Sequence, residues 1–178
     1  MEVLEMVEAC LRGDRISQKK LFDLFAGRML AVCMRYSKHR MEAEDLLQDG
    51  FIRVFMNLDQ FKNEGPLEQW IRRIMINNAI KKYHKKSNQN ESYTIDTVVE
   101  EGVQPDAIDQ ISEQEMMDMI AELPDGYRMV FNLFAIEGYS HKEISEMMHI
   151  EESTSRSQLA KARKVLQDKI IKNSNFLV

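Results

Sequence analysis

The chain has 178 residues and a formal net charge of −5, with 44% hydrophobic and 30% charged residues. This balance is typical of a globular protein with one medium domain or two small ones. No apolar run approaches the roughly 20 residues that a membrane-spanning helix needs. The acidic first residues, MEVLEMVEACLRGD, lack the basic and apolar regions of a signal peptide. We therefore expect a cytoplasmic protein with no membrane insertion.

Cysteine, proline and glycine are all scarce. Cys10 and Cys33 do not have the spacing of metal ligands, so reduced, buried thiols are the default. Three prolines and seven glycines leave little material for a sheet built on tight turns. No stretch shows the period of two that is typical of a strand. The sequence predicts an all-α protein.

Charge is distributed unevenly along the chain. Every charged residue from Glu91 to Asp125 is acidic, whereas residues 72–86 and 156–172 are basic. Two basic blocks separated by an acidic segment indicate two binding modules and a connector. We predict one domain over residues 1–86, a flexible acidic linker over 87–110 and a second domain over 111–178, because residues 87–110 show no helical period.

Three amphipathic helices are predicted in the first part of the chain. The first covers about residues 2–12 and ends at Gly13. Ser17 favours the N-cap position of the second, which runs to about residue 37. The third begins near residues 41–44 and runs to about residue 58. Their apolar faces predict core packing by Leu21, Phe22, Phe25, Met29, Val32, Cys33, Tyr36, Leu47, Phe51, Val54, Phe55 and Leu58.

The outer face of the third helix carries an unusual stripe. Carboxylates and an amide lie one turn apart there, and two apolar residues continue the line. Exposed apolar residues beside carboxylates suit a docking surface for a basic partner helix. Solvated charge near a helix N-terminus and a metal site are the competing interpretations, although no histidine lies at a suitable spacing. The stripe consists of Asp45, Gln48, Asp49, Ile52 and Met56.

A loop around residues 57–67 precedes a helix predicted over residues 70–86. Phe61 in this loop could stack an unpaired base or fill the core. The helix is apolar around most of its circumference and keeps one polar stripe of Arg73, Asn77, Lys81 and His84. Such a stripe suits nucleic acid, because cations neutralise phosphates and amides pair with base edges. A core helix with a basic solvated side is the alternative.

Four helices are predicted after the linker. Two cover residues 111–123 and 125–137, with Pro124 between them and Gly138 at the end. Ser140 and Glu143 form a capping-box pattern, so a short helix should begin at His141 and reach residue 148. After a tight connection, the last helix should run from about residue 153 to 171.

The last two helices have the spacing of a helix-turn-helix. Ser155, Leu159, Ala162 and Leu166 share the inward face of the final helix, facing Ile144 and Met147. A helical hairpin with a solvated basic face is the alternative. The DNA-binding interpretation assigns the outer face to the major groove, where polar and cationic side chains reach bases and phosphates.

At this point the motifs resemble a known family, the bacterial RNA polymerase sigma factors. Residues 45–55, DLLQDGFIRVF, look like the helix with which these proteins bind core polymerase, and residues 58–61 with WIRRI at 70–74 look like the promoter-melting part of sigma domain 2. Leu123-Pro124, EGYSHKEI at 137–144 and TSRSQLAKAR at 154–163 resemble sigma domain 4. Two domains and a linker are the layout of the extracytoplasmic-function (ECF) group.

The resemblance implies partners and roles at matched positions. Core RNA polymerase would bind Asp45, Gln48, Asp49 and Ile52. The minus-ten promoter element would be captured and melted by Phe61, Lys62, Asn63, Arg73, Asn77 and Lys81. The minus-thirty-five element would be read by Thr154, Arg156, Ser157, Gln158, Lys161 and Arg163. An anti-sigma factor is a further expected partner, and no cofactor, metal, small-molecule substrate or enzyme activity is expected.

Two positions depart from the family pattern. His149 stands where glycine is usual before the turn, so its backbone should differ or take a positive φ. Ser155 replaces a usual valine, which should loosen the packing of the inward face. Two other functions remain open: a helix-turn-helix regulator that acts without polymerase, and a metal-dependent nuclease that uses the carboxylates at 42–49.

Overall fold

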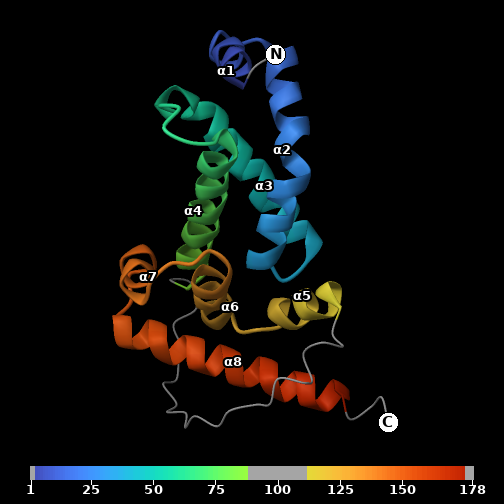
Figure 1. Cartoon of the computed structure of the whole chain (residues 1–178), viewed down its shortest axis with the longest axis vertical. Helices are drawn as coiled ribbons and strands as arrows, with labels where there is room; N and C mark the ends of the chain where they lie inside the picture. Colours follow the sequence, from blue (N-terminus) through green and yellow to red (C-terminus); the bar gives the residue numbers. More distant parts are fainter. Residues whose placement is uncertain (1–2, 88–111, 175–178) are drawn as a thin grey trace. The chain divides into compact units, whose positions relative to one another are not determined.

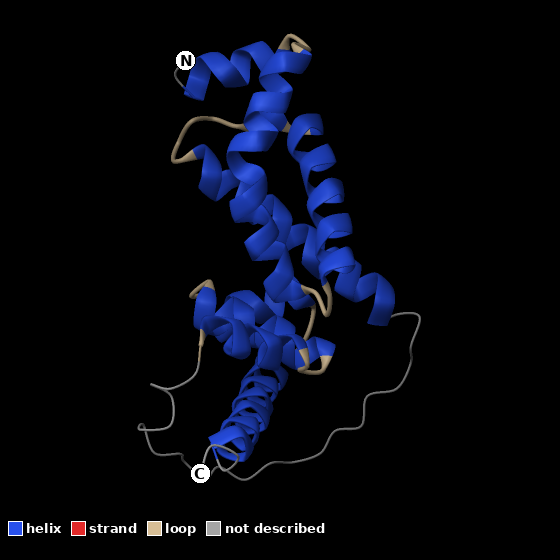
Figure 2. Ribbon diagram, turned by 90° about the vertical axis from the view of Figure 1, so that its right-hand side faces the viewer, coloured by secondary structure: helices blue, strands red, loops and turns tan. Residues whose placement is uncertain are grey.

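The computed structural model describes residues 3–87 and 112–174, and every regular element in these ranges is a helix (Figures 1 and 2). The chain divides into two compact units, residues 1–82 and 83–178. The prediction of an all-α protein with two helical bodies is confirmed. Most of the predicted acidic linker lies outside the described residues. No helix in the described ranges combines the length and the apolarity that crossing a membrane requires.

The first unit contains α1 (Val3–Leu11), α2 (Arg15–Tyr36), α3 (Arg40–Met56), a 3-10 turn η1 (Leu58–Gln60) and α4 (Leu67–Ser87), which continues past residue 82. α2 packs along α3, and α1 packs against α2. Both predicted thiols are buried, and burial raises the pKa of Cys33 to about 12, so it remains an unreactive thiol at neutral pH. The interior is formed mainly by Leu21, Met29, Val32, Leu46, Val54, Leu58, Ile71, Met75 and Ile76.

The N-cap of α2 is Asp14, so the prediction of Ser17 was wrong. The Asp14 carboxylate accepts hydrogen bonds from the backbone N–H groups of Ile16 and Ser17, both at 3.2 Å. Ser17 is buried, and its hydroxyl donates to the same carboxylate at 2.5 Å. Both residue types favour a cap. Asp14 takes the position because Gly13, at φ +82°, ends α1 immediately before it.

α3 and α4 approach closely and are joined by a polar contact. Gly50 of α3 has no side chain where Met75 of α4 packs: a Cβ there would lie 2.1 Å from the Met75 sulfur. Asn78 of α4 is buried, donates to the carbonyl of Leu46 at 3.2 Å and accepts from Arg53 Nε at 3.0 Å. These contacts fix how α3 and α4 present their outer faces.

The second unit contains α5 (Glu113–Ala121), α6 (Asp125–Phe131), a π-helical turn η3 (Asn132–Ile136), α7 (His141–Met148) and α8 (Glu152–Ser174). The helix predicted over 125–137 is therefore an α-helix followed by a π turn, and α8 is longer than predicted. α8 packs against α6 and α7. Its core with α5 contains Met119, Ile120, Leu123, Ala162, Leu166 and Ile170.

Buried Arg128 joins α5 to α6. Its Nη1 donates to the carbonyls of Ala121 at 3.0 Å and Leu123 at 2.8 Å, and its Nη2 donates to Asp125 at 2.6 Å. The last carbonyls of a helix lack intrahelical partners. Arg128 thus acts as a side-chain cap for the end of α5, a role that the sequence analysis did not assign.

The predicted capping box at the start of α7 is confirmed: Ser140 and Glu143 exchange backbone and side-chain hydrogen bonds. His149 ends α7 with φ +52°, so the expected positive φ is confirmed as well. Ile144 is buried as predicted, but Met148 rather than Met147 is its buried companion. The structure therefore contains the predicted helix-turn-helix.

Candidate nucleic-acid interfaces and docking face

The outer face of α3 forms an exposed stripe, which we call the docking stripe. Its polar members Asp45, Gln48 and Asp49 are all exposed. Ile52 and Met56, at 57% and 75% exposure, are among the most exposed large apolar residues of the described chain. One residue was missed: Met41, 70% exposed, lies one turn before Asp45 on the same line. The stripe therefore begins and ends with apolar residues around an acidic centre, and it consists of Met41, Asp45, Gln48, Asp49, Ile52 and Met56.

Two hollows adjoin on one face of α4. The loop hollow, of about 270 Å³, lies between the 60–66 loop and the first turns of α4. The helix hollow, of about 350 Å³, lies between the end of α3 and the middle of α4. Gln60, Trp70 and Arg73 line both. The two hollows thus form a continuous track along α4.

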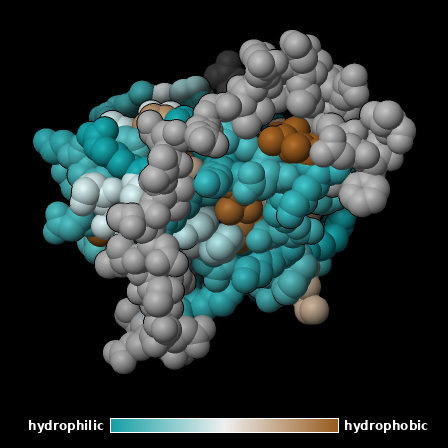
Figure 3. Space-filling view, turned by 90° about the horizontal axis from the view of Figure 1, so that it is seen from below, coloured by the Kyte–Doolittle hydropathy of each residue, from teal (hydrophilic) through white to brown (hydrophobic). Residues whose placement is uncertain are grey.

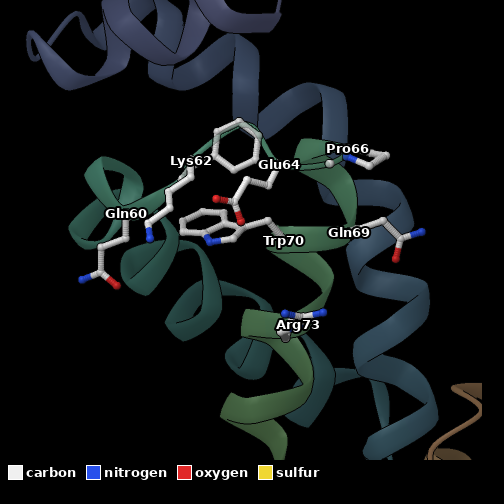
Figure 4. Close-up of a pocket in the computed structure, with 9 residues that line it drawn as sticks. Gln60, Lys62, Glu64, Pro66, Gln69, Trp70 and Arg73 are labelled. Carbon is white, nitrogen blue, oxygen red and sulfur yellow. The ribbon is translucent and has the colours of Figure 1, made fainter.

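The loop hollow brings Phe61 and Lys62 together with the start of α4. Figure 4 shows the charged ends of Lys62 and Glu64 near the Trp70 indole, with Arg73 one turn farther along the helix. Phe61 is half-buried and its ring centroid lies 5.7 Å from that of Trp70. Aromatic surface at the edge of a cationic hollow suits stacking of a flat, electron-rich ring. Asn63, at φ +56°, has a left-handed backbone conformation and is not among the residues that line the loop hollow.

The helix hollow is lined by cations and amides without a carboxylate. Arg73, Asn77 and Lys81, predicted as one stripe, all line it and are exposed. Arg53 also lines it, and its contact with Asn78 orients the guanidinium. Neither residue was predicted, because the two come from different helices. Clustered cations raise the local concentration of anions. This face therefore suits a phosphate backbone.

The predicted reading residues of α8 divide into three arcs. Figure 3, which views the α8 side, shows a mainly hydrophilic surface with separate hydrophobic spots. Thr154, Ser157 and Lys161 follow one strip at helical spacing. Arg156 and Arg163 lie on the flank toward α7. Gln158 lies on the other flank, where its amide atoms approach the position of a Gly126 Cβ at 3.3 Å.

The described residues contain no cluster of three or more metal-ligating side chains.

Two hydrogen-bonding positions on the inner side of the helix-turn-helix were not anticipated. Ser155, expected to loosen the packing, is completely buried, and its Oγ lies 2.9 Å from His141 Nδ1. The His141 ring stacks on Phe134. Burial lowers the pKa of His141, and the neighbouring Arg156 and Arg163 lower it further against the opposing effect of Glu152.

Comparisons with known proteins match both units. A family model described as Sigma-70 region 2 matches residues 21–89, and one described as Sigma-70, region 4 matches residues 113–166. The chain is 27% identical to the ECF RNA polymerase sigma factor SigW of Bacillus subtilis (strain 168), over 96% of this chain and 97% of the relative. It is 26% identical to the ECF RNA polymerase sigma-E factor of Haemophilus influenzae, over 93% of each.

A solved structure has a similar fold. The sigma factor RpoE of Bartonella quintana, crystallised with the anti-sigma factor NepR, matches 86% of this chain and 96% of its own at a TM-score of 0.53 and 21% identity. The region 2 and region 4 matches, with the two helical units, define a sigma-type transcription factor. The chain belongs to the sigma-70 family, in its ECF group. Members of this family act in promoter-specific transcription initiation and are initiation factors rather than enzymes.

Proposed function

We propose that this chain is a cytoplasmic sigma factor that binds core RNA polymerase, melts the minus-ten element with residues 1–86 and reads the minus-thirty-five element with residues 111–178. The observation that carries the proposal is the separation of surfaces within the first unit. The docking stripe is on α3, whereas the cationic track runs along α4. A protein that only bound duplex DNA would have no use for the stripe.

The docking stripe suits a basic helical partner. Asp45 and Asp49 supply negative charge, and Ile52 and Met56 supply apolar surface that burial would stabilise by about 25 cal/mol for each Å² removed from water. In the family this position binds the clamp helices of the largest polymerase subunit, and we assign the same role to the stripe here. Gln48 supplies a hydrogen-bonding group at its centre.

The α4 track suits a single strand. A base flipped from the duplex costs a few kcal/mol of lost stacking, which contacts in a pocket and neutralised phosphates offset. Phe61, Lys62 and Asn63 would hold the flipped base at the loop hollow. Arg73, Asn77 and Lys81 would hold the strand along the helix hollow. The aromatic wall of the loop hollow, and the cations of the helix hollow, which no carboxylate lines, support this assignment.

The outer arcs of α8 suit duplex DNA. Thr154, Ser157 and Lys161 form the strip that would face the major groove, and Arg156 and Arg163 would contact the flanking phosphates or bases. Gln158 belongs to the predicted set, and its side chain would leave α6 to reach DNA. An anti-sigma factor is the expected regulator, since the structurally similar RpoE was crystallised with one.

The test is core-dependent transcription. The purified chain is mixed with core polymerase and a library of promoter fragments, and run-off products are sequenced to identify the preferred promoter. The double variant Asp45→Arg with Asp49→Arg should lose association with core polymerase in a pull-down. Arg40→Gln with Lys20→Gln, which changes exposed charge elsewhere on α3 and α2, is the control. Absence of association by the parent chain, or association unaffected by the charge reversal, would refute the proposal.

A further inference from the structure

A hydrogen bond connects the first residue of α7 to the first turn of α8. Ser155 is completely buried on the inward face of α8, and its Oγ lies 2.9 Å from Nδ1 of His141. A buried hydroxyl needs a hydrogen-bonding partner, because an unpaired one loses the bonds that it made with water. His141 supplies the partner and thereby joins the two helices of the helix-turn-helix.

The His141 ring is itself held in place. It stacks on Phe134 of η3 with ring centroids 4.5 Å apart and an angle of 21° between the planes. The Arg163 guanidinium carbon lies 5.8 Å from the centroid of the same Phe134 ring, within the range of a cation–π contact. The four side chains form a continuous array from α8 through α7 and η3 and back to α8. We call it the His141 array: Ser155, His141, Phe134 and Arg163.

The apolar residues that α7 and α8 bury act differently from this hydrogen bond. Ile144, Met148 and Leu159 are buried there, and apolar packing is non-directional. Such packing has no preferred direction of its own, so a directional contact adds a separate restraint on the rotation of α8 about its axis. A hydrogen bond is directional, and this one lies in the first turn of α8, at the end that enters the groove in a helix-turn-helix protein.

We propose that His141 is a positioning residue for promoter reading by α8, acting through Ser155 and held by Phe134. The inference rests on the proposed function of α8. His141 fixes the rotation of α8, and hence the bases that Thr154, Ser157 and Lys161 meet. The same Phe134 ring restrains Arg163 on the flank.

The charge state of the ring is compatible with this role. Burial and the neighbouring cations Arg156 and Arg163 lower the pKa of His141, with Glu152 acting in the opposite direction. The lowered pKa favours the uncharged form of the ring. An uncharged imidazole has one donor and one acceptor nitrogen, so Nδ1 can either accept from the Ser155 hydroxyl or donate to it.

The test uses the full chain assembled with core polymerase on the promoter found by the run-off selection. Open-complex formation is measured on that promoter and on versions with single base changes in the minus-thirty-five element. The discrimination ratio is the amount of open complex on the selected promoter divided by the amount on a version with one base changed. The variants are His141→Phe, Ser155→Ala, their combination and His141→Asn, which keeps a hydrogen-bonding group near the position of Nδ1. Glu146→Gln, an exposed change on α7, is the control.

His141→Phe and Ser155→Ala should each lower the discrimination ratio measurably, by at most about tenfold, because the free energy of one hydrogen bond limits how strongly it can hold α8 in position. The double variant should be no worse than the worse single one, because both remove the same bond. His141→Asn should retain most of the ratio, and association with core polymerase should be unchanged throughout. A merely structural role would lower thermal stability and reduce activity on all promoters equally, leaving the ratio constant.

An unchanged ratio in His141→Phe, or additive losses in the double variant, would overturn the inference. A parent chain that transcribes but ignores changes upstream of the minus-ten element would refute the proposed role of α8, and the inference with it. That failure is distinguishable because it appears before any substitution is made.

Discussion

Replacing Gly50 by alanine should destabilise the first unit, although alanine is the better helix former. The exchange gains about 1 kcal/mol of intrinsic helix propensity. It also places a Cβ 2.1 Å from the sulfur and 2.9 Å from the methyl carbon of Met75. Met75 is 1% exposed and therefore has no solvent to move into. Overpacking of this kind costs about 1–3 kcal/mol, so the net change should be a loss of about 0–2 kcal/mol.

The chain contains a matched control. Gly27 lies within α2 and is exposed, and an added Cβ there would meet nothing within 4 Å. Gly27→Ala should therefore show the intrinsic gain of about 1 kcal/mol. Combining Gly50→Ala with Met75→Ala should be less destabilising than the sum of the single changes by about 1 kcal/mol or more, because the added methyl occupies part of the vacated space.

Native-state hydrogen exchange of α2, α3 and α4 amides in the full chain measures these differences without assuming that both units unfold together. Equal stabilisation by Gly50→Ala and Gly27→Ala would refute the reasoning. It would mean that α3 and α4 separate without cost, and that the docking stripe and the α4 track are not held in fixed relation.

Three further predictions concern helix ends and DNA affinity. Hydrogen bonds from Ser17 and Ile16 lower the pKa of Asp14. The cap that Asp14 gives to α2 is therefore complete above the ordinary pKa of the carboxyl and is lost as pH falls through the lowered value. Amide protection of α2 should fade in acid, and Asp14→Asn should abolish this pH dependence. Arg128→Met should destabilise the second unit by about 1–3 kcal/mol, because it leaves the carbonyls of Ala121 and Leu123 at the end of α5 without their donor; protection of α5 unchanged from the parent would contradict this. The free chain, at net charge −5, should bind random duplex weakly in a fluorescence titration, and tight binding that resists added salt would be inconsistent with it.

Periodicity was sufficient to predict the helices and most of the buried residues. Helix ends were less predictable, because Asp14 and Ser17 are both good caps and only the three-dimensional path through Gly13 decides between them. The prediction that Met147, and not Met148, packs beside Ile144 was wrong for a similar reason. In a helix as short as α7, two adjacent apolar residues fit the period almost equally well.

Contacts between distant positions could not be predicted from one sequence. The Arg53–Asn78 contact joins residues on separate helices, and no local pattern indicates it. Position 155 carries serine where the family usually has valine, and this difference was expected to loosen the packing of α8. Ser155 proved to be half of a polar pair, and only the structure shows that His141 is the other half. The order of motifs along the chain, by contrast, was enough to indicate the family.

α4 fills the interior with Ile71, Met75 and Ile76 and carries Arg73, Asn77 and Lys81 on its outer side. One helix thus both forms part of the core of the first unit and carries the residues that we propose for minus-ten recognition. A change of volume behind it, at Met75 or Gly50, would displace this outer row relative to α3. Promoter preference could then drift through substitutions that never touch DNA, and a search for specificity determinants confined to the surface would overlook them.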